Sequence, residues 1–419
     1  MKTTLKLSFI ALMFLTMTGY AQQGRLMQFE RPIGRDGVAI FEAPKADTVD
    51  YDGDLKVRVG GDFSIIFQGL SQSNDLVGDT LVELASNFAL PTANLNLDVQ
   101  IADGLRMHLR TYLSSRNHSE AWVKGGYFQI DRLDFIKPGM WSGLMEFTRL
   151  RFGMDEINYG DTHFRRSDNS RSMYNPFVGN YIMDAFTTEP FAEVSFFPGN
   201  FIGVLGLSNG RLNQSPLDGD NGVVVFGKAG YDNYEMDGLR LRLTGSFYHS
   251  TDKSTRDYIY NGDRAGARYY NVLEGLNDNR VSNFLPRFNT GFPNQTAVMF
   301  NPFLKYGGIE FFGVYETVSN GDDAGGSFTQ LGTELLYRFG GKDQFYAGVR
   351  YNKVDGEMAD GAPSIEITRT NIGGGWFLTN NVMAKLEYVT SAYDGDGWAG
   401  SKFQGAEFDG VVLEAVISF

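Results

Sequence analysis

The 419-residue chain contains no cysteine, only 12 prolines and, on inspection, no apolar run of the ~20 residues that a membrane-spanning helix needs. The absence of cysteine excludes disulfide scaffolds, zinc–thiolate sites and cysteine nucleophiles. Basic residues are also in the minority, with 37 Lys and Arg against 50 Asp and Glu, and the formal charge of −13 argues against nucleic acid as a partner. Glycine, with 51 residues, and aromatic side chains, at 14%, are abundant. This composition suits an all-β protein with many turns.

The first 21 residues differ from the rest and have the parts of a signal peptide. Two early lysines precede an apolar stretch over residues 7–15, and Gly19 and Ala21 place small residues at positions −3 and −1 of a cleavage site. The apolar stretch is too short for a spanning helix. We therefore expect export, with residues 1–21 removed and residues 22–54 forming a periplasmic N-terminal extension outside the folded domain.

Apolar and polar residues alternate in many later segments, a pattern that predicts β-strands with one apolar and one polar face. Near the start of the first such segment, Val57, Val59 and Phe63 share one face, while Arg58 and Asp62 share the other. Tight turns rich in Gly, Asn and Asp separate some strands, and long polar segments separate others. Short turns at one end and long loops at the other give the predicted sheet a direction.

Sixteen strands can be laid out in this way. Their expected ranges are 55–69, 93–101, 105–113, 121–131, 143–155, 190–197, 201–208, 222–230, 238–249, 296–306, 308–318, 327–339, 344–352, 364–376, 382–390 and 409–419. An even number of strands near the ~9 to 11 residues that cross a bilayer at a tilt is what an outer-membrane barrel requires. The predicted fold class is therefore all-β, a transmembrane antiparallel β-barrel formed by residues 55–419, with its outer face in outer-membrane lipid.

The final strand carries the strongest signal, because apolar residues alternate without error from Val411 to Phe419, the last residue. A terminal strand that ends in Phe, an export signal and about sixteen amphipathic strands together resemble the porins of Gram-negative outer membranes. The residues at 112–116, 121–127 and 301–303 resemble the phosphate-selective porin O/P group. The resemblance implies an outer-membrane homotrimer. We expect Phe419 to be the assembly signal for the barrel-insertion machinery.

The predicted inward faces of the strands are rich in basic side chains. The candidate pore-lining residues are Arg58, Arg106, His108, Arg110, Arg149, Arg151, Arg240, Arg242 and Arg350. Several glutamates have the same inward parity, namely Glu310, Glu316, Glu334, Glu387 and Glu414. The lining is therefore mixed in charge, and counting alone does not decide its selectivity.

Residues 156–185 follow the fifth strand and form the candidate constriction loop. The candidate pore residues of this loop are Arg165, Arg166, Arg171 and Tyr174. In a lumen, arginines facing acidic groups would set up a transverse field and would pass anions if positive charge dominates. The alternative is an ordinary extracellular loop with solvated charges. A second long loop, residues 250–295, contains several tyrosines that could cap the mouth of the barrel.

Three functions fit these patterns. The first is a porin for passive diffusion of small hydrophilic solutes and ions, with anion or phosphate preference as a further hypothesis. The second is a saccharide-specific channel lined by aromatic side chains, and the third is a structural or adhesive surface barrel with an apolar interior. We favour the first because the inward faces are mostly charged. We expect no enzyme activity, since His249 and Ser250 are strand neighbours that point to opposite faces and cannot act as a base and a nucleophile together. We also expect no cofactor and no metal.

Overall fold

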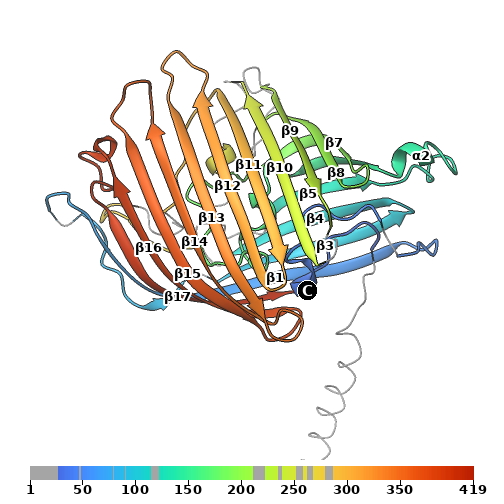
Figure 1. The fold of residues 1–419 in the computed structure, drawn as a ribbon, viewed down its shortest axis with the longest axis horizontal. Helices are drawn as coiled ribbons and strands as arrows, with labels where there is room; N and C mark the ends of the chain where they lie inside the picture. Colours follow the sequence, from blue (N-terminus) through green and yellow to red (C-terminus); the bar gives the residue numbers. More distant parts are fainter. Residues whose placement is uncertain are drawn as a thin grey trace, which may run out of the picture.

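The computed structural model describes residues 27–46, 49–78, 80–89, 91–114, 122–210, 222–234, 238–251, 258–261, 268–278 and 286–419. In this part of the chain, sixteen long strands form one closed antiparallel β-barrel (Figure 1). Each long strand pairs with its neighbours in sequence, and β1 closes the ring by pairing with both β3 and β17. The predicted fold class is confirmed.

The strands agree with the sixteen predicted ranges to within a few residues at most ends. They are β1 (Lys56–Ser73), β3 (Thr92–Ala102), β4 (Leu105–Ser114), β5 (Trp122–Ile130), β6 (Thr148–Glu156), β7 (Thr188–Phe196), β8 (Phe201–Ser208), β9 (Val224–Asp232), β10 (Leu239–Ser250), β11 (Gln295–Tyr306), β12 (Ile309–Asn320), β13 (Ser327–Phe339), β14 (Phe345–Glu357), β15 (Ile365–Phe377), β16 (Val382–Asp394) and β17 (Glu407–Ser418). The two-residue β2 (Asn87–Phe88) pairs with β1 beyond the end of β3.

The helical elements within the described residues are short. They are η1 (Gly34–Gly37), α2 (Ser142–Met145), η2 (Thr162–Phe164), α3 (Tyr258–Asn261) and η4 (Asp396–Trp398). Within the described ranges, no helix has the length and apolarity to cross a membrane. The sequence pattern assigned residues 143–147 to a strand, but the chain there forms α2 and the residues that lead into β6. Trp141, with a φ of 49°, turns the backbone into this helix, so alternation in residues 143–147 does not report a strand.

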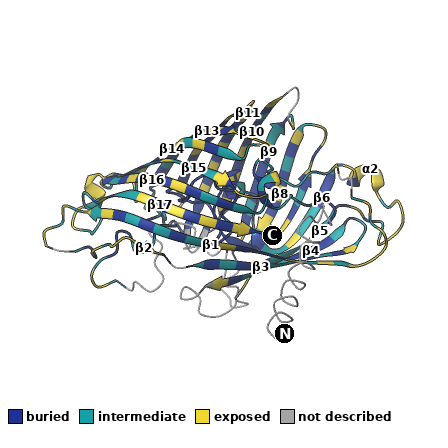
Figure 2. Cartoon of the chain, turned by 90° about the horizontal axis from the view of Figure 1, so that it is seen from below, coloured by how far each residue is buried: buried dark blue, intermediate teal, exposed yellow. Residues whose placement is uncertain are grey.

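The two faces of the sheet differ as the alternation predicts (Figure 2). On β17, Val411, Leu413 and Ile417 are exposed, whereas Val412 and Glu414 are buried. Exposed apolar residues on the outer face suit lipid, and charged residues on the inner face suit a lumen. Both the parity of the strands and the direction of the inward arginines therefore follow from the sequence.

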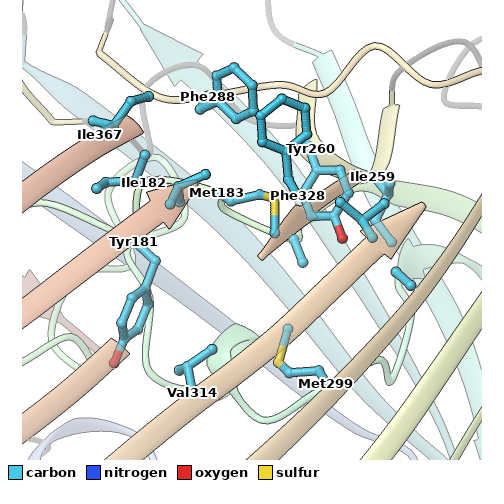
Figure 3. Packing of buried hydrophobic residues seen from close by; sticks show 14 of the residues in the cluster. Tyr181, Ile182, Met183, Ile259, Tyr260, Phe288, Met299, Val314, Phe328 and Ile367 are labelled. Atoms are coloured by element: carbon cyan, nitrogen blue, oxygen red, sulfur yellow. The ribbon is translucent and has the colours of Figure 1, made fainter. Parts of the chain in front are cut away.

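Irregular segments occupy much of the lumen. Residues 157–187, here called the inner loop, fold back inside the barrel: the backbone N–H groups of Ile182 and Met183 donate to Asn352 on β14 and Gln330 on β13, at 2.6 and 2.9 Å. Tyr181, Ile182 and Met183 pack there against the apolar side chains of the facing strands and of the second long loop (Figure 3). The apolar core of the protein thus lies inside the barrel.

Residues 27–46, here called the N-terminal segment, also lie inside the barrel. Met27 and Phe41 are buried, and Phe41 packs edge-on against Phe303 of β11 with ring centroids 5.2 Å apart. The expectation of an extension outside the barrel is therefore wrong for these described residues. Residues 22–26, 47 and 48 lie outside the described part of the chain. The segment lies inside the barrel because its apolar side chains are buried there against inward-facing aromatic rings.

Candidate functional site: the lumen cavity and its charged wall

A cavity of about 160 Å³ lies within the barrel, between the β1 and β3–β7 side of the wall, the N-terminal segment and parts of the inner loop. Charged side chains of both signs line it, seven arginines and six carboxylates. They are Arg31, Arg58, Arg106, Arg110, Arg149, Arg151 and Arg171, with Glu30, Glu42, Asp62, Asp98, Glu156 and Glu193. His108 and Tyr174 line it as well. All six predicted pore residues on β1, β4 and β6, together with two from the inner loop, therefore meet at one cavity.

Arg58 on β1 is the first of these wall arginines. It donates to Asp98 of the neighbouring β3 at 2.5 Å and to Glu30 of the N-terminal segment at 2.8 Å. Asp98 also contacts His108 Nδ1 on β4 at 2.7 Å. The predicted residues Arg58 and His108 thus share one carboxylate, which orients both toward the lumen.

Arg106 on β4 and Arg149 on β6 lie at the end of the barrel that carries the short turns. Arg106 donates to Gln129 at 2.9 Å, and Arg149 donates to Asp131 at 2.9 Å. Arg149 also donates to the carbonyl oxygen of Ala43 in the N-terminal segment at 2.8 Å. Both side chains point inward, as strand parity predicts. Some of their N–H groups, however, already donate to other groups of the protein.

Arg110 and Arg151 contact acidic groups at the level of the inner loop. Arg110 donates to Asp168 at 3.1 Å, and Arg151 donates to Glu193 of β7 at 3.2 Å. The side chain of Arg151 keeps 16% of its surface exposed, whereas that of Arg110 keeps 4%. Arg151 is therefore among the wall arginines that a solute in the cavity can contact most readily.

Three predicted pore residues lie away from this cavity. Arg240 and Arg242 on β10 bind Asp232 and Asp161, with N···O distances of 2.6 and 2.8 Å. Arg350 on β14 binds Glu334 at 2.7 Å beneath the inner loop and is 1% exposed. Strand parity placed all three on the inner face, but packed segments cover them. A side chain must therefore point inward to contact a solute, but it must also be left uncovered by the segments packed inside the barrel.

The predicted residues of the inner loop divide in the same way. Arg165 is enclosed between Glu310 and Glu334, at 2.7 and 3.1 Å, and Arg166 pairs with Asp184 at 2.7 Å. These two guanidinium groups hold the loop in place. The remaining two predicted loop residues line the cavity; they are Arg171, which donates to Glu156 at 2.8 Å, and Tyr174, which donates to the carbonyl oxygen of Pro32 at 3.1 Å.

Burial shifts several pKa values in the inner loop and the N-terminal segment. Burial would raise the pKa of Glu42, but attraction to Arg242 and Lys228 outweighs it and lowers the value to about 2. Burial and the nearby Lys228 lower the pKa of His163 to about 3, so this imidazole is neutral at pH 7. Asp161 keeps a lowered pKa because Arg242 and Lys228 offset the cost of its burial. The site therefore carries ionised pairs and an uncharged histidine.

Several further charged residues of the lumen were not predicted from the sequence. Lys124 and Lys228 have inward parity on β5 and β9, and they bind Asp168 and Asp161. Their positions in the alternation of β5 and β9 could have predicted that these two lysines point inward. Glu30 and Glu42 belong to no strand, so alternation says nothing of their position. Only the apolar residues spaced through that segment, such as Phe41, hinted that it packs against something.

The fold is similar to those of solved outer-membrane proteins at low sequence identity. OprB of Pseudomonas putida has a TM-score of 0.54 and 10% identity, with 87% of this chain and 94% of that chain covered. OmpF of Salmonella typhi, solved in complex with daunomycin, has 0.52 and 13%, covering 88% and 99%. The trimer form of OmpT of Vibrio cholerae has 0.52 and 11%, covering 87% and 99%. No protein-family model and no curated protein matches the sequence. Identities this low establish the shared barrel fold.

Proposed function

We propose that this chain is an outer-membrane porin through which small hydrophilic solutes and ions diffuse passively. The observation that carries the proposal is the charged cavity inside a closed sixteen-strand barrel, whose outer face is apolar. A polar lumen within a lipid-facing wall lowers the barrier for hydrophilic solutes. The similarity of the fold to OprB and OmpF supports a location in the outer membrane and a role as a porin.

Export by cleavage after residue 21 and assembly as a homotrimer complete the proposal. The first 21 residues have the composition of a signal peptide. One of the similar structures is described as a trimer. Insertion would need the barrel-assembly machinery, for which Phe419 at the end of β17 is our candidate signal.

A preference for anions, with phosphate as one candidate, is a finer part of the proposal. Seven arginines against six carboxylates give the cavity a nearly balanced lining, so any preference must come from where the charges are placed. Arg149 and Arg151 lie on one strand of the wall, and guanidinium groups hold oxyanions by paired hydrogen bonds. The motifs at 112–116, 121–127 and 301–303 that resemble phosphate-selective porins support phosphate in particular.

Single-channel recording of the purified mature protein in planar bilayers tests the porin proposal. We expect stepwise conductance in KCl. A second candidate function, a structural barrel, is favoured by the apolar packing of the inner loop around Ile182 (Figure 3). Folded protein that inserts into the bilayer and gives no current would support that candidate instead.

The anion preference is tested by the double variant Arg149→Glu with Arg151→Glu. We expect its zero-current potential in a KCl gradient to move toward cation selectivity. The shift should be largest at low ionic strength, because the Debye length falls from ~8 Å at physiological salt to ~3 Å at 1 M. An unchanged potential at normal conductance would remove the anion preference and leave the porin proposal intact.

A further inference from the structure

The N-terminal segment crosses the lumen at the end of the barrel that carries the short turns. The Arg35 N–H donates to the carbonyl oxygen of Asn380, in the turn between β15 and β16, at 2.8 Å. Lys45, near the other end of the segment, binds Asp131 at 3.0 Å, just after β5. Between them, Phe41 packs against β11 and β12. The segment therefore touches widely separated parts of the ring at one level.

Arginines near the short-turn end of the wall hold this segment. Arg58 donates to Glu30, Arg149 donates to the carbonyl oxygens of Ala43 and Pro44, and Arg240 donates to that of Ala39. All three arginines were predicted to line the pore. In the structure, the carboxylates and carbonyls of the chain's own N-terminal segment occupy them.

The segment is joined to the wall by side chains more than by sheet pairing. It contributes no strand to the barrel, and its one regular element is the short η1. Glu42 binds Arg242 at 2.7 Å and Lys228 at 3.2 Å, and both contacts are ion pairs. Leaving the lumen would thus break ion pairs and apolar contacts without opening the hydrogen-bonded barrel.

We propose that residues 27–46 are a built-in plug at the short-turn mouth of the pore, and that Glu30 and Glu42 determine both its closure and the charge preference of the cavity. This inference rests on the proposed porin function. The two glutamates supply two of the six carboxylates that line the cavity. Neutralising them weakens the contacts of the plug with Arg58 and Arg242 and leaves seven arginines against four carboxylates.

The test combines charge removal with a removable tether. The chain has no cysteine, so Arg35→Cys with Asn380→Cys introduces the only possible disulfide, at positions whose backbones already share a hydrogen bond. We would record single-channel conductance of full-length wild type, of Glu30→Gln with Glu42→Gln, and of that variant carrying the cysteine pair. The matched control is Glu407→Gln, an exposed glutamate at the opposite end of the barrel. Heat-modifiable gel mobility checks that each variant is folded.

We expect the Glu30→Gln, Glu42→Gln variant to conduct several-fold more than wild type and to shift its zero-current potential toward anions, while Glu407→Gln behaves as wild type. With the cysteine pair, oxidation should restore the low conductance and reduction should release it. A current that responds neither to the charge removal nor to oxidation would overturn the plug and leave the porin proposal standing. No current from any folded form, reduced or oxidised, would overturn the porin proposal and the plug with it.

Discussion

On the β4–β7 side of the lumen, Arg106 and Arg151 face a cavity, whereas on the β11–β17 side Arg350 and Glu334 face the packed inner loop. Both sides have the same alternation of apolar outward and polar inward residues (Figure 2). The difference arises because Tyr181, Ile182 and Met183 of the inner loop, with the buried Arg165, pack against β11–β15, whereas a cavity remains on the β4–β7 side. Strand parity thus decides which way a side chain points, and the irregular segments decide whether a solute can reach it.

The seam between β1 and β17 joins these two sides, and breaking it should have the largest effect. Phe419 donates to and accepts from the backbone of Gly61, both at 2.9 Å. Deletion of Phe419 removes this pair and the terminal aromatic group, so we expect a several-fold fall in assembled barrel. Heat-modifiable mobility of outer-membrane fractions measures it. Normal amounts of assembled barrel after the deletion would refute the assembly role of this residue.

Removing one arginine from each side sharpens the comparison. Arg165→Ala removes the buried guanidinium group that contacts both Glu310 and Glu334, and leaves them with Arg338 and Arg350 alone. Two buried hydrogen bonds between charged groups are lost, so we expect a loss of about 3–5 kcal/mol in the free energy of unfolding. Arg151→Ala removes one contact, to Glu193 at the cavity, and should cost about 1–3 kcal/mol. Denaturant unfolding of the refolded proteins in detergent measures both. Equal losses would show that the two sides are equally packed.

Acidification should loosen the inner loop through His163. The unfolded histidine binds a proton below its ordinary pKa of 6.5, whereas burial lowers the folded value to about 3. Between these values the unfolded chain binds more protons, so stability falls as pH falls, by at most about 1.4 kcal/mol per pH unit. The contribution is fully present above pH 6.5.

Limited proteolysis of the inner loop between pH 7 and pH 4 follows this effect. In the variant His163→Gln the dependence between pH 6.5 and 4.5 should flatten. Below pH 4.5 the unfolded chain also binds a proton at Glu42, whose pKa in the folded protein is lowered to about 2. This adds a second loss of stability, which the variant retains. A pH profile identical in wild type and variant would contradict the role of His163.

The smallest effect is expected at an ion pair outside both sides of the lumen. Arg132 binds Asp103 at 2.7 Å at the short-turn end, with 44% and 31% of the two side chains exposed. Solvent screens such a pair, so Arg132→Ala should cost less than about 1 kcal/mol. The denaturant midpoint measures it, and a loss as large as that of Arg165→Ala would contradict the distinction between buried and exposed pairs.

The sequence predicted the barrel well because alternation over nine or more residues is a local signal with one structural meaning in this setting. It placed residues such as Arg106 and Arg151 on the inner face correctly. It could not place Phe41 or Glu42, because an irregular segment carries no period that reports its neighbours. The distance in sequence between Glu42 and Arg242 shows the difficulty: their contact depends on the closed barrel, which no local pattern describes.

The seam between the first and last strands is also fastened from within. Glu414 on β17 accepts hydrogen bonds from Ser64 on β1 at 2.6 Å, from Ser172 of the inner loop at 2.7 Å and from Arg268 of the second loop at 2.5 Å. Contacts between residues about 350 positions apart form late in folding, because the chain must first close a very large loop. Until then β1 and β17 are open edges that can pair with other chains. Pairing of β1 with β17 removes these edges, and the contacts at Glu414 then hold the closed seam to two loops inside the barrel.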